Sequence, residues 1–555
     1  MGGMREWRED WLFMGTWSAA IRYDLAALDH QVVEEFQQQN ELRRDICVVG
    51  AGPAGLAAVK IIKDSPQYKA GLWTVTAFEA RNRVGGIWLP APPTDDPPLT
   101  PLYDSLTTNL PHPVMAYPSF SFPPGTALFP PASTVLTYLE AYTAHFELAP
   151  HIRLNTSITS TSRNGITGKW TVITAHSSSQ TSETHTFDHL IVANGHYRTP
   201  RLPDTPGLAG WLDAQKAFHA VRYRNPSDFG DARTVLVVGA GPSGQDLVTD
   251  LLASGRTVVH SSTGAVREDL RDGRLKVRGR VAQYLHPSAG RVLLDDGTEE
   301  AGIDCAVLAT GYKVEFPFLP PDIVRQTLPP SVPPLPQALY NSTYHVFPLA
   351  RHIFPLVDAN ALPPSSIAFI GLPVRVAPLP LLEAQVRAVL HVFAHPDSLD
   401  PTQEAVDIVA RYETLLDQVT TRRSATGSST TNAEGKPAEV DDQDQPDEAI
   451  KGDPVELAIA RAWHRFDGHE QFAYRDVLHA FAEHPLRVPA WEIEMYDAKG
   501  VLREEWRELE RAGLADEWVR GVGEAGGEKG IEEWVDLMRR LLKRAEERHP
   551  ERSRL

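Results

Sequence analysis

The chain has 555 residues, 42% of them hydrophobic, so it can bury a sizeable core, and its length suggests two to four domains. Its 54 basic and 72 acidic side chains give a formal charge of −18, which would repel nucleic acid and anionic membranes on average. Cys47 and Cys305 lie in separate apolar runs, so a disulfide scaffold, a CxxC redox pair and a thiolate zinc site are unsupported. We expect a cytoplasmic protein with no nucleic-acid partner and no membrane span, because no apolar run approaches the roughly 20 residues that cross a bilayer.

The composition changes along the chain in four steps. Residues 1–44 are polar with several aromatics and end in "EEFQQQNELRR", which predicts a helix before the first strand. From residue 45 to about 396, β-branched runs alternate with Gly/Pro-rich loops and helical patterns, as α/β architecture requires. Residues 421–452 are rich in Ser, Thr, Asp, Gly and Pro and predict a disordered insertion, whereas 453–548 place apolar residues at helical spacings of three and four.

The first glycine-rich motif begins at Val48, in "DICVVGAGPAGLAAVKII", where an apolar strand leads into an Ala-rich helix. In this context one glycine allows the tight turn, the next lets the backbone approach a pyrophosphate, and the third lets helix and strand pack closely. The next predicted strand, "WTVTAFEA", ends near Glu79, whose carboxylate is suited to a ribose hydroxyl pair. The residues expected along this dinucleotide are Gly50, Ala51, Gly52, Pro53, Ala54, Gly55 and Glu79.

A second copy of the motif, "VVGAGPSGQDLV", begins at Val237 and contains Gly239, Gly241 and Gly244. Here the following strand ends in a histidine and two serines with no carboxylate. Because an acidic residue would repel a 2′-phosphate whereas hydroxyls and an arginine could bind one, the pattern favours NADPH over NADH. The candidate 2′-phosphate ligands are Ser261, Ser262 and Arg267.

Two dinucleotide sites in one chain indicate hydride transfer from NADPH to a tightly held flavin. At this point the chain resembles the flavin-containing monooxygenases, particularly their fungal members, from about residue 45 to 396 and more weakly in the C-terminal helices. Besides both glycine motifs, the resemblance rests on "EARNRVGGIW", "YDSLTTNLPHPVMAYPSFSFP", "ANGHYRTPRLP", "FHAVRYRNPSDF", "LATGYKVEFPFL" and "IAFIGLP". It implies two Rossmann-like domains, an FAD domain with an inserted NADP domain, followed by a helical C-terminal region.

The resemblance also implies a domain division and site residues. The FAD domain would span 45–215 and 303–415, with the NADP domain at 216–302. In the family, "GGxW" lies against the flavin and the asparagine of "TN" lies beside the isoalloxazine and nicotinamide, while "SGQD" lies along NADP. Asn109 would be the catalytic residue, because its neutral amide can donate a hydrogen bond at every working pH. The residues carried over are Ile87, Trp88, Thr108, Asn109, Ser243, Gly244, Gln245 and Asp246.

One family signature is degenerate in this chain. It has the form FxGxxxHxxx followed by Phe or Tyr, and His219 and Tyr223 match it, but Asp213 and Gln215 occupy the Phe and Gly positions. His219 is either a buried histidine that ties its linker or a residue that couples domain motion to turnover. Related Baeyer-Villiger enzymes usually carry Trp where Tyr223 stands, which weighs against ketone oxygenation.

The implied reaction uses FAD, NADPH and O2. NADPH reduces FAD, the reduced flavin captures O2, and a C4a-hydroperoxyflavin transfers one oxygen atom to an amine nitrogen or a sulfide. The alternatives are ketone oxygenation, or a degenerate flavoprotein acting as an NADPH oxidase or a binding module. A disulfide reductase is rejected because it needs a cysteine pair beside the flavin, and the scattered histidines predict no metal.

The C-terminal tripeptide Ser553, Arg554 and Leu555 resembles a peroxisomal address, which competes with the cytoplasmic location. Neither the substrate nor the oligomeric state is indicated by the sequence.

Overall fold

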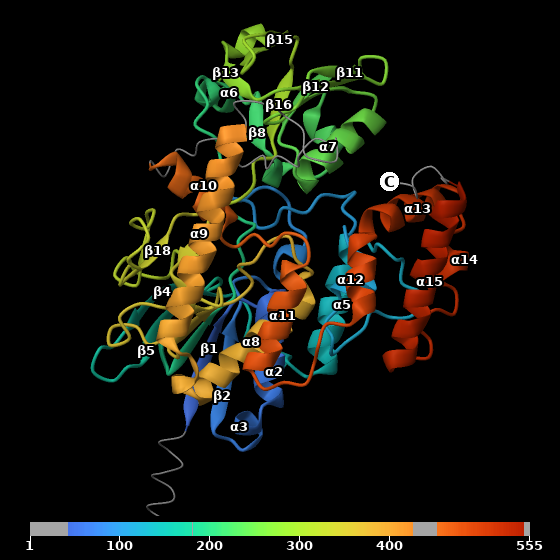
Figure 1. The fold of residues 1–555 in the computed structure, drawn as a ribbon. Helices are drawn as coiled ribbons and strands as arrows, with labels where there is room; N and C mark the ends of the chain where they lie inside the picture. The colour runs from blue at the N-terminus through green and yellow to red at the C-terminus, as the bar shows by residue number, and fades with distance from the viewer. Residues whose placement is uncertain (1–42, 180, 426–451, 549–555) are drawn as a thin grey trace, which may run out of the picture.

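The computed structural model describes residues 43–179, 181–425 and 452–548 (Figure 1). The predicted N-terminal helix, nearly all of the predicted disordered insertion and the C-terminal tripeptide therefore lie outside the described residues. Within the described ranges, the chain forms two nucleotide-binding-type α/β units and a C-terminal group of helices, which confirms the predicted fold class.

The first unit is built on a five-stranded parallel sheet of order β22-β7-β1-β2-β3. Ile46 and Val48 of the central strand belong to the core on the helix side, whereas Cys47 and Val49 belong to the core on the other face. Such a strand is buried on both faces, which explains its unbroken apolar run. The strands are β1 (Arg44–Val49), β2 (Trp73–Phe78), β3 (Ile152–Arg153), β7 (His189–Val192) and β22 (Ile367–Phe369).

Helices cover one face of this sheet and a small antiparallel sheet covers the other. Helix α2 packs beside α8 in the larger core, and Trp170 and Phe187 of the antiparallel sheet fill the smaller one. The covering helices are α2 (Pro53–Asp64), α3 (Pro66–Lys69), α4 (His112–Met115), α5 (Ala132–His145) and α8 (Pro378–Ala394). The antiparallel strands are β4 (Thr156–Arg163), β5 (Trp170–His176) and β6 (Ser182–Phe187).

The second unit is a six-stranded sheet of order β11-β12-β10-β9-β16-β8, parallel except for the edge strand β11. Strand β16 lies in this sheet, although the division expected at residue 302 assigns it to the other unit. The elements of this sheet and its main helix are β8 (Ala217–His219), β9 (Thr234–Val238), α7 (Pro242–Ala253), β10 (Thr257–Ser261), β11 (Glu268–Leu270), β12 (Leu275–Arg278) and β16 (Cys305–Leu308). Its other face carries α6 (Leu208–Asp213), β13 (Val281–Tyr284), β14 (Arg291–Leu294) and β15 (Glu299–Ala301).

After β16 the chain returns to the first unit through short strands and then forms the C-terminal helices. The short strands are β17 (Val324–Arg325), β18 (Leu339–Asn341), β19 (Val346–Phe347), β20 (Leu349–Ala350) and β21 (Phe354–Pro355). The helices are α9 (Pro401–Ala425), α10 (Pro454–Ala462), α11 (Glu470–Phe481), α12 (Ala490–Asp497), α13 (Lys499–Arg511), α14 (Ala515–Val519) and α15 (Gly527–Arg548). Trp506 and Leu537 join α13 and α15 to the larger core of the first unit, whereas α9 and α10 pack together around Trp463 in a separate cluster.

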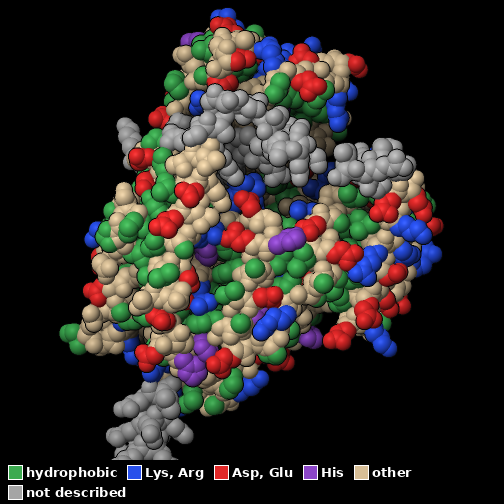
Figure 2. All heavy atoms as spheres, in the orientation of Figure 1, with side chains coloured by type: hydrophobic (Ala, Val, Ile, Leu, Met, Phe, Trp, Pro, Cys, Tyr) green, Lys and Arg blue, Asp and Glu red, His purple; other side chains and the backbone are tan. Residues whose placement is uncertain are grey.

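In this view the second unit lies above the first, and α12 to α15 lie beside the first unit (Figure 1). The space-filling view shows the surface hollowed where the second unit meets the rest of the molecule, with basic side chains beside the hollow (Figure 2). None of the helices in the described ranges combines the length and apolar character needed to cross a bilayer.

Candidate functional site

The first glycine turn joins β1 to α2 by a very close approach of backbone to backbone. Gly50 has φ +97°, and a Cβ on Gly55 would lie 1.9 Å from the Gly50 carbonyl oxygen. The first N–H groups of any helix have no acceptor within the helix. In α2 the N-cap residue Gly52 provides no side-chain acceptor for them, and Pro53 has no N–H. This is the geometry that receives a pyrophosphate, and the turn fits the expected FAD.

Glu79 lies directly beside this turn. The residue is 7% exposed, and its Oε2 accepts a hydrogen bond from the Ala51 N–H at 2.8 Å while Oε1 accepts one from the Arg81 N–H at 2.9 Å. Each oxygen retains a second lone pair, so the carboxylate can still accept from the two hydroxyls of a ribose. The turn and the carboxylate are thus brought together as the sequence predicts.

The segment containing Ile87 and Trp88 packs against the same turn. It forms the 3₁₀ helix η1 (Gly86–Trp88), and a Cβ on Gly86 would lie 2.8 Å from the Gly52 Cα. Thr100 holds the Ile87 carbonyl through its hydroxyl, and Trp88 packs on the larger core. Ile87 and Trp88, the two residues expected beside the flavin, therefore lie in a segment that packs against the first glycine turn.

Asn109 has a fixed backbone and an available amide. The preceding Thr108 is 3% exposed, donates its N–H to the Pro130 carbonyl at 3.0 Å and donates its hydroxyl to the Leu110 carbonyl at 2.8 Å. Asn109 is exposed, and its side chain has no hydrogen-bond partner among the described residues. An amide in this setting is free to meet a ligand.

The second glycine turn repeats the close packing but leaves more space at its middle glycine. A Cβ on Gly239 would lie 2.4 Å from the Ala309 carbonyl oxygen, and one on Gly244 would lie 1.9 Å from the Gly239 carbonyl oxygen. A Cβ on Gly241 would meet nothing within 4 Å. The turn and the N-terminus of α7, including the half-buried Ser243, fit the expected NADP, with open space above Gly241.

Gln245 and Asp246 both make hydrogen bonds within the protein. Gln245 is exposed and donates its side-chain amide to the Ala240 carbonyl at 3.0 Å, so it stays at the turn. Asp246 instead accepts a hydrogen bond from the Tyr103 hydroxyl at 2.6 Å, and its other oxygen lies 3.7 Å from the Arg503 guanidinium. The sequence holds one sign of this contact that the prediction for Asp246 did not use, because aspartates four apart on one helix, at 246 and 250, lie on the same face.

The three candidate 2′-phosphate ligands differ in the contacts that they already make within the protein. Ser261 is 0% exposed and donates its hydroxyl to the Gly279 carbonyl at 2.8 Å. The Arg267 guanidinium donates to the Thr298 hydroxyl at 2.8 Å and lies 3.7 Å from the Glu300 carboxylate. Only Ser262, half-buried at the end of β10, has a hydroxyl without a partner among the described residues.

The structure explains why the family signature has a glycine at the position that Gln215 occupies in this chain. Gln215 has φ +56°, and it follows α6 as the left-handed residue of a helix-ending motif in which Lys216 N–H donates to the Trp211 carbonyl at 2.8 Å. Such a position favours glycine. His219 is 4% exposed and accepts a hydrogen bond from the Val221 N–H at 3.1 Å, and burial lowers its pKa to about 3, so it is neutral.

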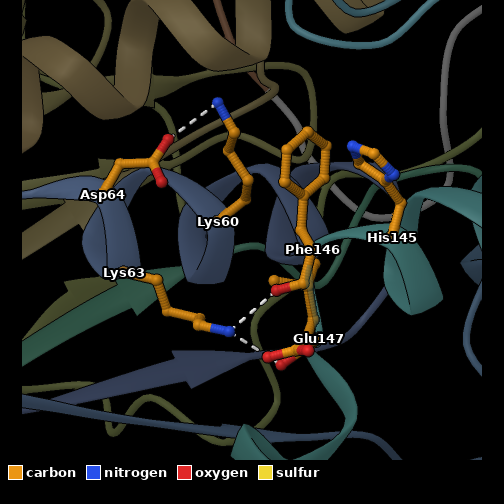
Figure 3. Close-up of a pocket in the computed structure, with 7 residues that line it drawn as sticks. Lys60, Lys63, Asp64, His145, Phe146 and Glu147 are labelled. Atoms are coloured by element: carbon orange, nitrogen blue, oxygen red, sulfur yellow. Dashed lines mark hydrogen bonds and ion pairs between the residues drawn. The ribbon is translucent and has the colours of Figure 1, made fainter.

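A separate pocket of about 240 Å³ lies at the other end of α2 (Figure 3). Lys63 donates to the Phe146 and Glu147 carbonyls at 2.7 and 2.8 Å, and Lys60 pairs with Asp64 at 2.9 Å. Both ammonium groups are thus already satisfied by protein partners, far from the glycine turn. In the described ranges, no group of three or more His, Cys, Asp or Glu side chains is arranged to hold a metal ion.

Comparisons with known proteins agree with this geometry. The family model described as flavin-binding monooxygenase-like matches residues 43–267 and 266–431. The thiol-specific monooxygenase of Saccharomyces cerevisiae is 29% identical over 359 residues, covering 63% of this chain and 77% of that protein. The Arabidopsis thaliana protein flavin-containing monooxygenase FMO GS-OX-like 1 is 30% identical over 390 residues, covering 67% and 77%.

Solved structures share the fold. The structure of S-allyl-L-cysteine S-oxygenase from Allium sativum matches with a TM-score of 0.63 and 23% identity, covering 92% of this chain and 99% of that chain. Tmm from Pelagibacter sp. strain HTCC7211 matches with a TM-score of 0.60 and 16% identity, covering 84% and 91%. With two glycine turns that fit FAD and NADP, the chain belongs to the flavin-binding monooxygenase-like family and is an FAD- and NADPH-dependent monooxygenase.

Proposed function

We propose that this enzyme transfers one oxygen atom of O2 to a soft nucleophile, a sulfur of a thiol or sulfide or an amine nitrogen. The observation that carries the proposal is Asn109, whose amide is exposed and without a protein partner in the described ranges, on a backbone held by Thr108. The likeness to a thiol-specific monooxygenase supports sulfur as the first nucleophile to test. When bound, FAD would pass two electrons from NADPH to O2, so that one oxygen atom can reach the nucleophile and the other can leave as water.

The side chains around the site would bind, orient and exclude water. The Asn109 amide donates a hydrogen bond at the reacting oxygen, and it keeps this role at every working pH because an amide does not titrate. Trp88 supplies an apolar wall beside the flavin, which helps to keep water from the reacting atoms. Glu79 orients the adenosine half of FAD through its ribose while its own position is fixed by two backbone N–H groups.

The experiment compares wild type with Asn109→Asp in assays containing thioanisole, cysteamine or N,N-dimethylaniline. Oxygenated product, hydrogen peroxide and NADPH consumption are measured together. We expect Asn109→Asp to keep flavin reduction by NADPH but to lose most product, with the missing oxygen recovered as hydrogen peroxide. The matched control is Asn164→Asp, since the Asn164 side-chain oxygen accepts two N–H bonds in an exposed hairpin loop, and an aspartate can do the same.

Two outcomes would overturn the proposal. An unchanged product yield per NADPH in Asn109→Asp would remove Asn109 from the reaction. If the wild-type enzyme instead releases one hydrogen peroxide for each NADPH consumed with every nucleophile, it is an NADPH oxidase.

A further inference from the structure

The segment that leads to Asn109 is anchored in both units. Tyr103 is 9% exposed and belongs to the core of the second unit, with its ring 5.7 Å from that of Tyr223. Three residues later the chain binds the first unit, because the Leu106 carbonyl accepts from the Ala132 N–H at 3.1 Å. Asn109 therefore lies just beyond the point where the chain crosses from one unit to the other.

Two aspartates on one face of α7 hold the first part of this segment. Asp246 accepts from the Tyr103 hydroxyl at 2.6 Å. One turn further along the helix, Asp250 accepts from the Ser105 hydroxyl at 2.5 Å and from the Tyr223 hydroxyl at 2.8 Å. Burial, together with the neighbouring Asp246 charge, raises the pKa of the Tyr103 hydroxyl, so that it remains a donor.

We propose that Tyr103 and Ser105 are positioning residues that hold the Asn109 segment in register with α7, and that Asp246 serves this contact rather than bound NADP. Gly241 caps the N-terminus of α7, and a Cβ there would meet nothing within 4 Å, so this end of the helix would hold the NADP pyrophosphate. Bound NADP and Asn109 would then both be positioned by the same helix. The catalytic part of this inference rests on the role proposed for Asn109.

Arg503 joins the C-terminal helices to the same contact. Its guanidinium lies 3.7 Å from the second oxygen of Asp246, and both side chains are 22% exposed. At this distance and exposure the ion pair is weak. The hydroxyl contacts from the Asn109 segment are therefore the ones to test.

The variants are Tyr103→Phe, Ser105→Ala, Asp246→Asn and Asp246→Ala in the full-length holoenzyme. A misplacement of about 1 Å can lower a rate on the order of 10²-fold, so we expect Tyr103→Phe and Asp246→Ala to release about tenfold more hydrogen peroxide per NADPH. Their NADP+ dissociation constants, measured from the flavin absorbance change, should stay within about twofold of wild type. Asp246→Asn keeps an acceptor oxygen and should restore much of the coupling.

The matched control is Tyr412→Phe. The Tyr412 hydroxyl donates to the Glu456 carboxylate at 2.6 Å between α9 and α10, which is the same kind of contact outside this site. It should leave the peroxide yield unchanged. Ser105 is exposed, so Ser105→Ala tests the contact without endangering the core.

Amide hydrogen exchange of the peptide 103–112 gives a readout that does not require turnover. We expect faster exchange there in Tyr103→Phe and Ser105→Ala, and no change in Tyr412→Phe. Unchanged exchange and coupling in both variants would overturn the inference. A rise of the NADP+ dissociation constant in Asp246→Ala alone, with Tyr103→Phe silent, would make Asp246 a cofactor ligand. If wild type forms no oxygenated product, the role proposed for Asn109 fails. Amide hydrogen exchange and NADP+ binding would still decide whether Tyr103 and Ser105 hold the segment against α7.

Discussion

The carboxylate of Glu79 accepts a hydrogen bond from the N–H of Ala51, the second residue of the first glycine turn, at 2.8 Å. This contact joins the end of β2 to the beginning of α2. It places a carboxylate at the turn before any cofactor is present, and the backbone N–H groups of Ala51 and Arg81 hold its two oxygens in place. One side chain, Glu79, thus both fixes the conformation of the turn and is expected to bind the ribose of FAD.

Replacement of Glu79 should therefore weaken FAD binding. Hydrogen bonds to a charged group contribute about 1.5–3 kcal/mol, so Glu79→Gln is expected to raise the FAD dissociation constant about tenfold or more. Flavin fluorescence during reconstitution of the apoprotein measures this. Glu183→Gln on the exposed strand β6 is the control and should bind FAD like wild type. Equal affinities for the two variants would show that Glu79 holds no ribose.

Two glycines of the second turn should separate folding from binding. A Cβ on Gly244 would lie 1.9 Å from the Gly239 carbonyl, so Gly244→Ala is expected to disrupt the second unit. Gly241→Ala has space, and it should keep the wild-type unfolding temperature but raise the NADPH dissociation constant about tenfold by displacing the pyrophosphate. Thermal unfolding and anaerobic flavin reduction at varied NADPH measure both quantities. Unchanged NADPH binding in Gly241→Ala would place the pyrophosphate elsewhere.

His112 should make the protein sensitive to mild acid. The ring is 2% exposed between Phe122 and Trp534, neither nitrogen has a partner among the described residues, and burial lowers its pKa to about 3. In the unfolded chain this histidine takes up a proton near pH 6.5, whereas in the folded protein it stays neutral down to about pH 3. Between these two values the free energy of unfolding therefore falls by about 1.4 kcal/mol for each pH unit of acidification. His112→Phe removes this loss.

The measurement is chemical unfolding of wild type and His112→Phe at pH 7.5 and 5.5. The stability advantage of the variant should grow by about 1.4 kcal/mol at the lower pH. His286→Gln, at an exposed histidine, is the comparison. A constant difference between His112→Phe and wild type would contradict the prediction.

Gln215 is a site where glycine should stabilise the fold. The left-handed conformation costs a non-glycine residue roughly 1–2 kcal/mol, while glycine loses about 0.5–1 kcal/mol of chain entropy, so Gln215→Gly should gain about 0.5–1 kcal/mol. Ala214→Gly, one residue earlier and right-handed, should instead destabilise. Unfolding in urea compares them. A loss of stability in Gln215→Gly would mean that its side chain makes a contact worth more than the backbone strain.

The parts of the fold that local sequence determines were predictable. Both glycine turns and their helices follow from short-range spacing, and the buried strand β1 follows from its unbroken apolar run. The alternation of side chains along a strand also predicts the burial of Ser261. It lies two residues after the buried Val259 and so faces the same side of β10.

The contacts that cross between distant segments were not predictable from spacing. Asp246 adjoins the glycine motif in sequence, but its partner Tyr103 lies 143 residues earlier. Likewise Arg267 follows the serines closely, yet the hairpin of β14 and β15 brings Thr298 to its guanidinium. In both cases the position of the partner depends on how whole sheets pack.

Because the Tyr103 ring fills a place in the core of the second unit, this NADP-binding unit is not a self-contained cassette. A fragment cut from β8 to β16 would leave that place empty beside Tyr223 and expose apolar surface there. An exchange of coenzyme preference between related enzymes by domain grafting would need to carry residues 100–106 along with the graft. The core of the second unit is thus completed by a side chain from the segment that leads to Asn109.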